Sequence, residues 1–364
     1  MRRFDYFLFE NFDADAQSQN PLNPRKILNS GTDALLSHIA SYPAGQCPST
    51  GDVLEEIMIR EEILRKSGDA VVFNTPVFLK EDAQKLKTGT AKAASRLADR
   101  IAEGMESIYT VCGKIDNGFS VERNLYHILC GMVFDGFFFD YLEQTGAVAI
   151  SHLRPSGMDY LSVIYEKCEE LDALSNGILC SYNRFTDGEC SLESFGDAMG
   201  NRHDFYRFFR LLESGELPEI FVTGEVLLRT FGEADKGAIL AQVKKLIRKG
   251  DCVPDAMTLL SHFGYVKDRK LCIPVYTEKH TSTITHIAEL VEDWMGEAIV
   301  SELTALSQTL DITAVRHGVL PGEIANELYH LLFGSINEEL VTRGLVEEPP
   351  YIPGEGRYLR CIQY

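Results

Sequence analysis

The chain lacks a long uncharged apolar stretch, and this absence argues against a membrane span. A span needs about 18 such residues, whereas the nearest candidate, Val133 to Leu142, contains Asp135 and Asp140. The acids near the start, Asp5 and Glu10 among them, are not typical of a signal or transit peptide. We therefore expect a cytoplasmic protein without a membrane partner.

Paired cysteines and the common catalytic motifs are also missing. The nine cysteines are scattered without a CxxC pair, which is typical of reduced thiols rather than of a disulfide framework or a zinc site. The patterns HExxH, GxSxG, Walker A and GxGxxG do not occur. The sequence therefore predicts no enzyme, no metal site and no cofactor.

The overall charge limits the possible partners. The 364 residues include 54 acidic and 35 basic side chains, which gives a formal net charge of −19. Such a field repels polyanions and argues against indiscriminate coating of nucleic acid or of an anionic membrane. A local basic surface stays compatible with it, so charge has to be followed along the chain.

Two distant parts of the chain carry closely similar heptads. Residues 125–131 read LYHILCG and residues 328–334 read LYHLLFG, so five of the seven positions are identical. Two further similarities align Pro76 with Pro274 and Tyr160 with Tyr358, in the same order along the chain. Three landmarks in register are typical of a duplication. The sequence therefore predicts two diverged repeats.

The first repeat is expected to start with helices and strands in close succession. Apolar periodicity predicts helices over 34–40 and 53–65, and β-branched and aromatic residues predict a strand over 70–78. A long helix over 81–108 follows, because this segment is rich in good helix formers.

The second repeat shows the same order. Helices are predicted over 239–247 and 254–263, and a hairpin with a charged turn at 267–270 precedes a long helix over 281–310. Helix, helix and hairpin are the order of a winged helix. We expect an α+β, mainly helical protein with two diverged repeats, each a winged helix-turn-helix followed by a helical extension.

The predicted domains follow from these repeats. In chain order they are an N-terminal arm (1–25), the first winged helix (26–80), a helical extension (81–167), a helical connector (168–235), the second winged helix (236–278), and a helical extension with a C-terminal extended segment (279–364).

The winged segments resemble a known family. The run Val71-Val72-Phe73 with its downstream helix, and the run from Tyr265 to Cys272, are similar to the wings of bacterial regulators of the ArsR/MarR type, here in tandem. The resemblance implies DNA-binding transcriptional control, often by a dimer.

Positive charge is concentrated in the second winged segment. Residues 239–270 hold seven basic and three acidic side chains, whereas residues 33–70 hold three basic and seven acidic ones. Phosphate contacts need basic side chains, and the second helix of the motif enters the major groove. The candidate DNA-binding residues are Lys244, Lys245, Arg248, Lys249, Thr258, Ser261, His262, Lys267, Arg269 and Lys270.

Two features of this segment favour a less specific interpretation. The expected reading helix, 254–263, contains no arginine, asparagine or glutamine, the side chains that usually make bidentate contacts with bases. A solvated charged helix face explains the basic run from Lys244 to Lys249 as well as phosphate binding does.

The heptads and the aromatic run after the first heptad supply candidates for a ligand pocket or an interface. These are Tyr126, His127, Phe134, Phe138, Tyr329 and His330. Core packing is the alternative interpretation, because Phe134, Phe137, Phe138 and Tyr141 would share one stripe of an α-helix.

The sequence therefore predicts a cytoplasmic transcriptional regulator whose second winged helix contacts the DNA backbone. The expected partners are double-stranded DNA, a small effector ligand and a second copy of the chain in a homodimer. The alternative is a non-catalytic protein-interaction module whose winged helices no longer bind DNA, which the net charge of −19 favours.

Overall fold

The described part of the chain combines many helices with two larger sheets, of four and five strands, and two two-stranded hairpins. The computed structural model describes residues 1–13, 17, 19–198, 202–214, 219–231 and 236–364. About 53% of the chain is helical and 17% lies in strands, so the α+β, mainly helical class is confirmed.

Two compact units make up the chain, and each combines three separated segments. The first contains Met1–Leu97, Phe138–Ser175 and Met295–Ile336, and the second contains Ala98–Phe137, Asn176–Trp294 and Asn337–Tyr364. The bounds of these units differ from those of the expected consecutive domains, and that division stays a prediction. Most boundaries between the units fall inside helices. No change in composition along the sequence marks them.

The first unit opens with a strand, three short helices and a hairpin. In chain order its first elements are β1 (Phe4–Glu10), α1 (Pro24–Leu28), α2 (Asp33–Ala40), α3 (Val53–Arg60), β2 (Leu64–Ser67), β3 (Ala70–Phe73) and β4 (Val77–Phe78). The Asp52 side chain accepts a hydrogen bond from the Glu55 amide and so caps the start of α3. The predicted N-terminal arm thus contains a strand.

Helix α3 ends at Arg60, before the predicted end at residue 65. Glu62 has a φ of 57°, and the amide of Ile63 donates to the Met58 carbonyl at 2.9 Å. This left-handed residue closes the helix as glycine usually does. Leu64–Ser67 then pair with Ala70–Phe73 as a hairpin. The periodicity argument failed here because no glycine or proline marks the end of the helix.

The sheet of the first unit is built around β6 (Asp159–Glu166). Strand β1 pairs antiparallel with β6, β4 runs parallel to it, and β5 (His152–Leu153) pairs antiparallel with its first residues. A hydrophobic core joins the three short helices and the hairpin to this sheet. Its buried members include Ile27, Leu36, Ile39, Met58, Phe73 and Ile164.

The second unit contains a hairpin where the sequence analysis expected a helical connector. Strands β7 (Leu179–Thr186) and β8 (Ser191–Asp197) pair antiparallel around the turn that contains Asp187-Gly188. Gly188 has a φ of 89°, which favours glycine. The prediction of a helical connector over 168–235 is therefore wrong where β7 and β8 lie. The helices of this stretch are α7 (Glu169–Asn176), α8 (Phe205–Ser214) and α9 (Val222–Phe231), with a 3₁₀ turn at Glu219–Phe221.

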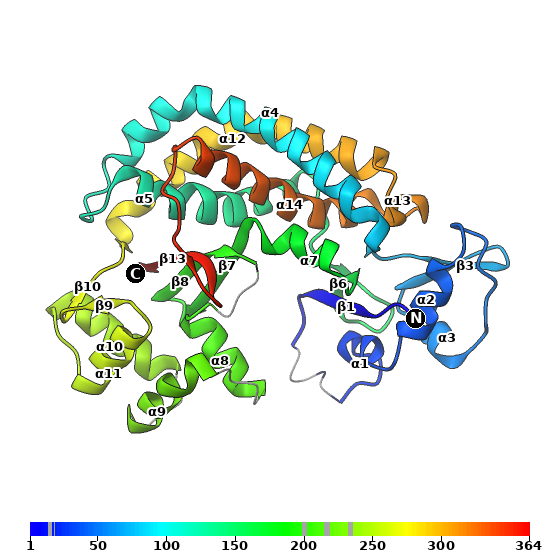
Figure 1. The fold of residues 1–364 in the computed structure, drawn as a ribbon, viewed down its shortest axis with the longest axis horizontal. Coiled ribbons are helices and arrows are strands. Elements are labelled where there is room, and N and C mark those ends of the chain that lie inside the picture. Colours follow the sequence, from blue (N-terminus) through cyan, green and yellow to red (C-terminus); the bar gives the residue numbers. More distant parts are fainter. Residues whose placement is uncertain (14–16, 18, 199–201, 215–218, 232–235) are drawn as a thin grey trace. The chain divides into compact units, whose positions relative to one another are not determined.

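Helices α10 and α11 and a short hairpin follow, and they pack together (Figure 1). Their bounds are α10 (Lys236–Lys249), α11 (Pro254–His262), β9 (Val266–Lys267) and β10 (Lys270–Leu271). Pro254 stands in the first turn of α11, where its missing amide costs nothing. The shared core includes Leu240, Val243, Leu260, Phe263, Tyr265 and Ile362.

The sheet of the second unit is built around β13 (Gly356–Gln363). Strand β8 pairs antiparallel with β13, β11 (Val275–Tyr276) runs parallel to it, and β12 (Tyr351–Ile352) pairs antiparallel with its first residues. Strand β7 extends the sheet beyond β8.

The remaining elements are helices and helical turns, of which α4, α12 and α14 are long. They are a 3₁₀ turn (Lys80–Asp82), α4 (Ala83–Cys112), α5 (Val121–Leu125), a π-helix (Tyr126–Phe137), α6 (Phe138–Gln144), α12 (Glu278–Thr309), α13 (Thr313–Arg316) and α14 (Pro321–Thr342). Within the second unit α4 and α12 pack closely, since a Cβ on Gly104 would lie 2.1 Å from the Trp294 ring.

The π-helix changes which aromatic side chains are buried. Phe134 and Phe138 are buried, but Phe137 is 42% exposed. The predicted common stripe is therefore wrong at Phe137, because the i→i+5 hydrogen bonds of a π-helix widen the turn beyond 3.6 residues.

One described helical stretch, Val121–Gln144, is long and apolar enough to cross a membrane by length and composition. The sequence analysis passed over it because it required a run without charge. The most apolar window of this stretch is 67% buried, and core helices of soluble proteins meet the same criterion. The cytoplasmic location accordingly stays a prediction.

Candidate functional site

The predicted DNA-binding residues lie on three neighbouring elements of the second unit. Helix α10 carries Lys244, Lys245, Arg248 and Lys249, helix α11 carries Thr258, Ser261 and His262, and the β9–β10 hairpin carries Lys267, Arg269 and Lys270. Six of the seven basic side chains are exposed, and Lys244 is partly buried. Two sets of basic side chains, on α10 and on the hairpin turn, therefore precede and follow in the chain the helix expected to read bases.

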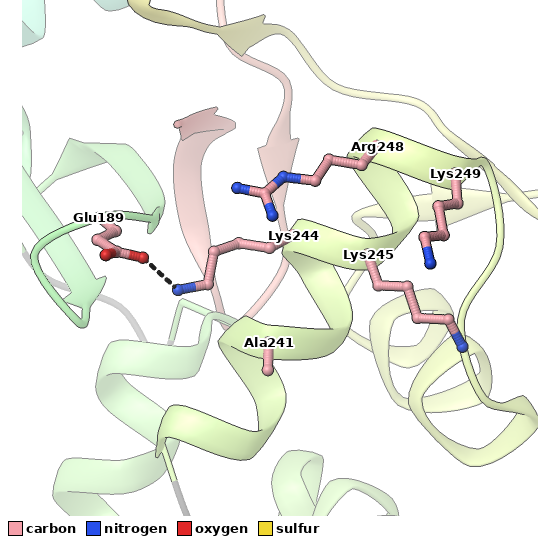
Figure 2. Close-up of a pocket in the computed structure, with 6 residues that line it drawn as sticks. All are labelled: Glu189, Ala241, Lys244, Lys245, Arg248 and Lys249. Carbon is pink, nitrogen blue, oxygen red and sulfur yellow. Dashed lines mark hydrogen bonds and ion pairs between the residues drawn. The ribbon is translucent and has the colours of Figure 1, made fainter.

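The basic face of α10 lines an open pocket of about 310 Å³. Lys244, Lys245, Arg248 and Lys249 contribute to it, and Glu189 is the acidic residue in its lining. Figure 2 shows Lys244 and Arg248 extending toward the Glu189 side, whereas Lys245 and Lys249 point away from it. A pocket with this lining attracts anions.

Lys244 already has partners inside the protein. Its ammonium group lies 2.9 Å from Asp187 Oδ2 and 2.9 Å from Glu189 Oε2, both in the β7–β8 turn. The hydrogen bonds that Lys244 donates to Glu189 and Asp187 hold the pKa of Lys244 above its ordinary value. Arg248 stacks over the Tyr364 ring at 5.2 Å. Lys245 and Lys249 are thus the more available cations of α10.

The β9–β10 turn presents like charges side by side. Lys267 and Lys270 are directly opposed in the hairpin, and Asp268 and Arg269 between them have φ values of 50° and 61°. Opposed like charges and left-handed backbone at non-glycine residues both cost stability. Asp251 offsets part of the charge through an ion pair with Arg269 at 3.1 Å.

Helix α11 offers few groups for reading bases. Thr258 and Ser261 are exposed, but the Thr258 hydroxyl donates to the Pro254 carbonyl at 3.0 Å. The His262 ring nitrogen lies 2.9 Å from that of His203. Burial lowers the pKa of His262, and burial with neighbouring positive charge lowers that of His203 to about 4. This histidine pair is therefore uncharged at neutral pH.

The first winged segment is less acidic at its surface than its composition indicates. Two of its acids, Glu55 and Glu61, are buried. Glu55 accepts hydrogen bonds near the start of α3, including one from the Thr50 amide at 2.9 Å. Over residues 33–70 exposed acids still outnumber exposed bases, so the charge difference from residues 239–270 persists at the surface.

The candidates for a ligand pocket lie mainly in packed cores. In the second unit, Tyr126 and His127 are fully buried, and the Tyr126 hydroxyl donates to the Phe195 carbonyl at 2.9 Å. Phe134, in the same unit, is buried as well.

The candidates in the first unit also pack against other aromatic rings. Phe138 and Tyr329 are buried. The Tyr329 ring centre lies 5.0 Å from that of Phe139, and the partly buried His330 has its Nδ1 3.0 Å from the Asn326 carbonyl. These positions fit the core-packing alternative of the sequence analysis.

The sequence analysis missed a buried polar cluster in the first unit. Glu61, Arg154, Tyr160 and Glu323 are nearly inaccessible, and each has at least one polar atom without a hydrogen-bond partner. His152 Nδ1 lies 3.3 Å from a Glu323 oxygen. No local motif marks this cluster, because its members come from the residue after α3, the β5–β6 hairpin and α14.

Within the described ranges, no group of three or more His, Cys, Asp or Glu side chains is arranged to hold a metal ion. Comparison with protein-family models, curated protein sequences and solved structures finds no match to this chain. The functional argument therefore rests on the basic surfaces of the second unit.

Proposed function

We propose that this protein binds double-stranded DNA through its second winged segment, residues 236–278, as a transcriptional regulator. The observation that carries the proposal is the exposed positive charge on α10 and on the β9–β10 turn, on either side of α11 in the chain. Basic side chains in this arrangement suit the phosphates that flank a major groove.

The element order supports a winged helix in each half of the chain. Helices α2 and α3 precede the β2–β3 hairpin, and α10 and α11 precede the β9–β10 hairpin. In each sheet a central strand, β6 or β13, has one antiparallel and one parallel neighbour, and a short third strand pairs with its start. These matching pairings support the proposed duplication, with the first copy diverged from DNA binding.

The proposed contact is mainly with the backbone. Helix α11 presents Thr258 and Ser261 to solvent, whereas His262 is engaged with His203. Short hydroxyl side chains discriminate bases weakly compared with the bidentate groups of arginine, asparagine or glutamine. We therefore expect modest sequence preference and strong dependence on salt.

The second candidate function is a protein-interaction module. The sparse reading face of α11 and the net charge of −19 favour it. It predicts no DNA binding even at low salt, which separates it from the first candidate.

Fluorescence anisotropy with a random-sequence duplex, titrated from low to physiological salt, tests the proposal. Replacing Lys267, Arg269 and Lys270 together by alanine should weaken binding and flatten the salt slope by about 0.9 for each phosphate that the variant no longer touches. Lys66→Ala, in the first hairpin, is the matched control and should leave both unchanged. Equal binding by the wild type and the triple variant would contradict the hairpin assignment.

A further inference from the structure

The β7–β8 turn places two carboxylates against the basic pocket of α10. Asp187 and Glu189 both bind the Lys244 ammonium group at 2.9 Å, and the Lys244 side chain is only 19% exposed. Figure 2 shows the Glu189 carboxylate joined to this ammonium group by a dashed line. The two carboxylates therefore occupy the position beside Lys244 that an external anion would take.

The two acids of the turn have different roles. The second oxygen of Asp187 accepts the amides of Glu189 and Cys190 at 3.1 and 2.9 Å, so Asp187 also holds the turn together. Glu189 is 78% exposed, and within the described ranges Lys244 is the only hydrogen-bond partner of its carboxylate. Glu189 can therefore be changed without dismantling the turn.

We infer that the β7–β8 turn is an internal competitor for phosphate at Lys244, and that Glu189 sets the affinity for DNA. The inference rests on the proposed function, because it concerns the same basic surface. A DNA phosphate can contact Lys244 only after this ion pair opens. The turn thus withholds one cation from the interface while Lys245 and Lys249 stay available.

A double-mutant cycle tests the inference through the dependence of one residue on the other. Glu189→Gln, Lys244→Ala and the double variant are compared with the wild type by anisotropy at several salt concentrations. Since exposed ion pairs are weak, Glu189→Gln should bind the duplex about two- to five-fold tighter. Its salt slope should steepen by about 0.9, as expected when one more phosphate is bound.

The Lys244→Ala change gives the result that is specific to competition at Lys244. In the wild type it should alter affinity little, because Asp187 and Glu189 together already occupy the ammonium group. In the Glu189→Gln background it should abolish the gain. The matched control is Glu292→Gln, which removes the same charge from an exposed position of α12 and should leave affinity unchanged. Thermal melting of every variant checks that the fold is intact.

The outcomes separate the inference from the proposed function. If the wild type binds DNA and Glu189→Gln binds with the same affinity, the inference is overturned. The proposed DNA binding is then still supported. Equal gains from Glu189→Gln and Glu292→Gln also overturn it, since they show a general charge effect. Failure of both the wild type and Glu189→Gln to bind at low salt overturns the inference together with the proposed function.

Discussion

Glu323 in α14 is a buried carboxyl group whose replacement should stabilise the protein above neutral pH. Its side chain is 2% exposed, and one of its oxygens has no hydrogen-bond partner. Burial raises the pKa of Glu323 to about 7, an effect that Arg154 opposes and Glu62 strengthens. In Glu323→Gln, a neutral side chain of the same shape takes its place.

The magnitude follows from linkage between protonation and folding. The ordinary pKa of the group is 4.5, so the unfolded chain releases its proton first as pH rises. Below about pH 4.5 both states hold the proton and Glu323 costs no stability, and between about pH 4.5 and 7 the folded protein progressively loses stability relative to the unfolded chain. At 1.36 kcal/mol for each pH unit, the penalty above pH 7 approaches about 3 kcal/mol. Weakening of the interaction with His152 offsets part of the gain in the variant.

Urea denaturation at pH 5, 6, 7 and 8 measures the effect. We expect the variant to exceed the wild type by about 2 kcal/mol at pH 8, with a smaller difference at pH 5. Glu297→Gln, at an exposed position of α12 in the same unit, is the matched control and should show no pH-dependent difference. If Glu323→Gln is as destabilised at pH 8 as at pH 5, the carboxylate is a required hydrogen-bond acceptor and the reasoning is wrong.

Three further outcomes follow from other parts of the structure. Gly104→Ala should lower the free energy of unfolding by about 1–3 kcal/mol in urea denaturation, because the new Cβ meets the Trp294 ring. This loss should exceed the gain from the better helix propensity of alanine. A stabilised variant would refute close packing at this position. Tyr126→Phe should cost about 1 kcal/mol by the same measurement, because the hydrogen bond to the Phe195 carbonyl is removed, and an unchanged midpoint would contradict that bond. A thiol reagent should modify Cys272 first in the native protein, since it is the exposed cysteine, and Cys272→Ser should remove the fast phase; a fast phase that survives would place the reactive thiol elsewhere.

The elements with strong local signals were predictable. Apolar periodicity and Pro254 placed α11 correctly, and helix-forming composition placed most of α4. The Asp187-Gly188 pair was a readable hairpin signal that the helical expectation for 168–235 overlooked. The end of α3 was not readable, because Glu62 adopts a left-handed conformation that usually calls for glycine.

The candidate site was predictable in composition and unpredictable in pairing. Charge counting along the chain found Lys244, Lys249 and their neighbours, because a run of basic residues is visible without a fold. The turn acids Asp187 and Glu189 lie more than fifty positions from Lys244. Only folding brings β7 and β8 to α10, so the sequence could not show that Lys244 is already neutralised.

Residue types and their short-range spacing were enough to indicate the mainly helical class, the segments with helical periodicity and the asymmetry of charge between residues 33–70 and 239–270. These properties depend on side-chain type and short-range spacing. Tertiary structure alone decided the two composite units, the π-helix that exposes Phe137, and the burial of Glu61 and Glu323. Each of these depends on interactions between residues far apart in the chain, where packing and desolvation outweigh local preference.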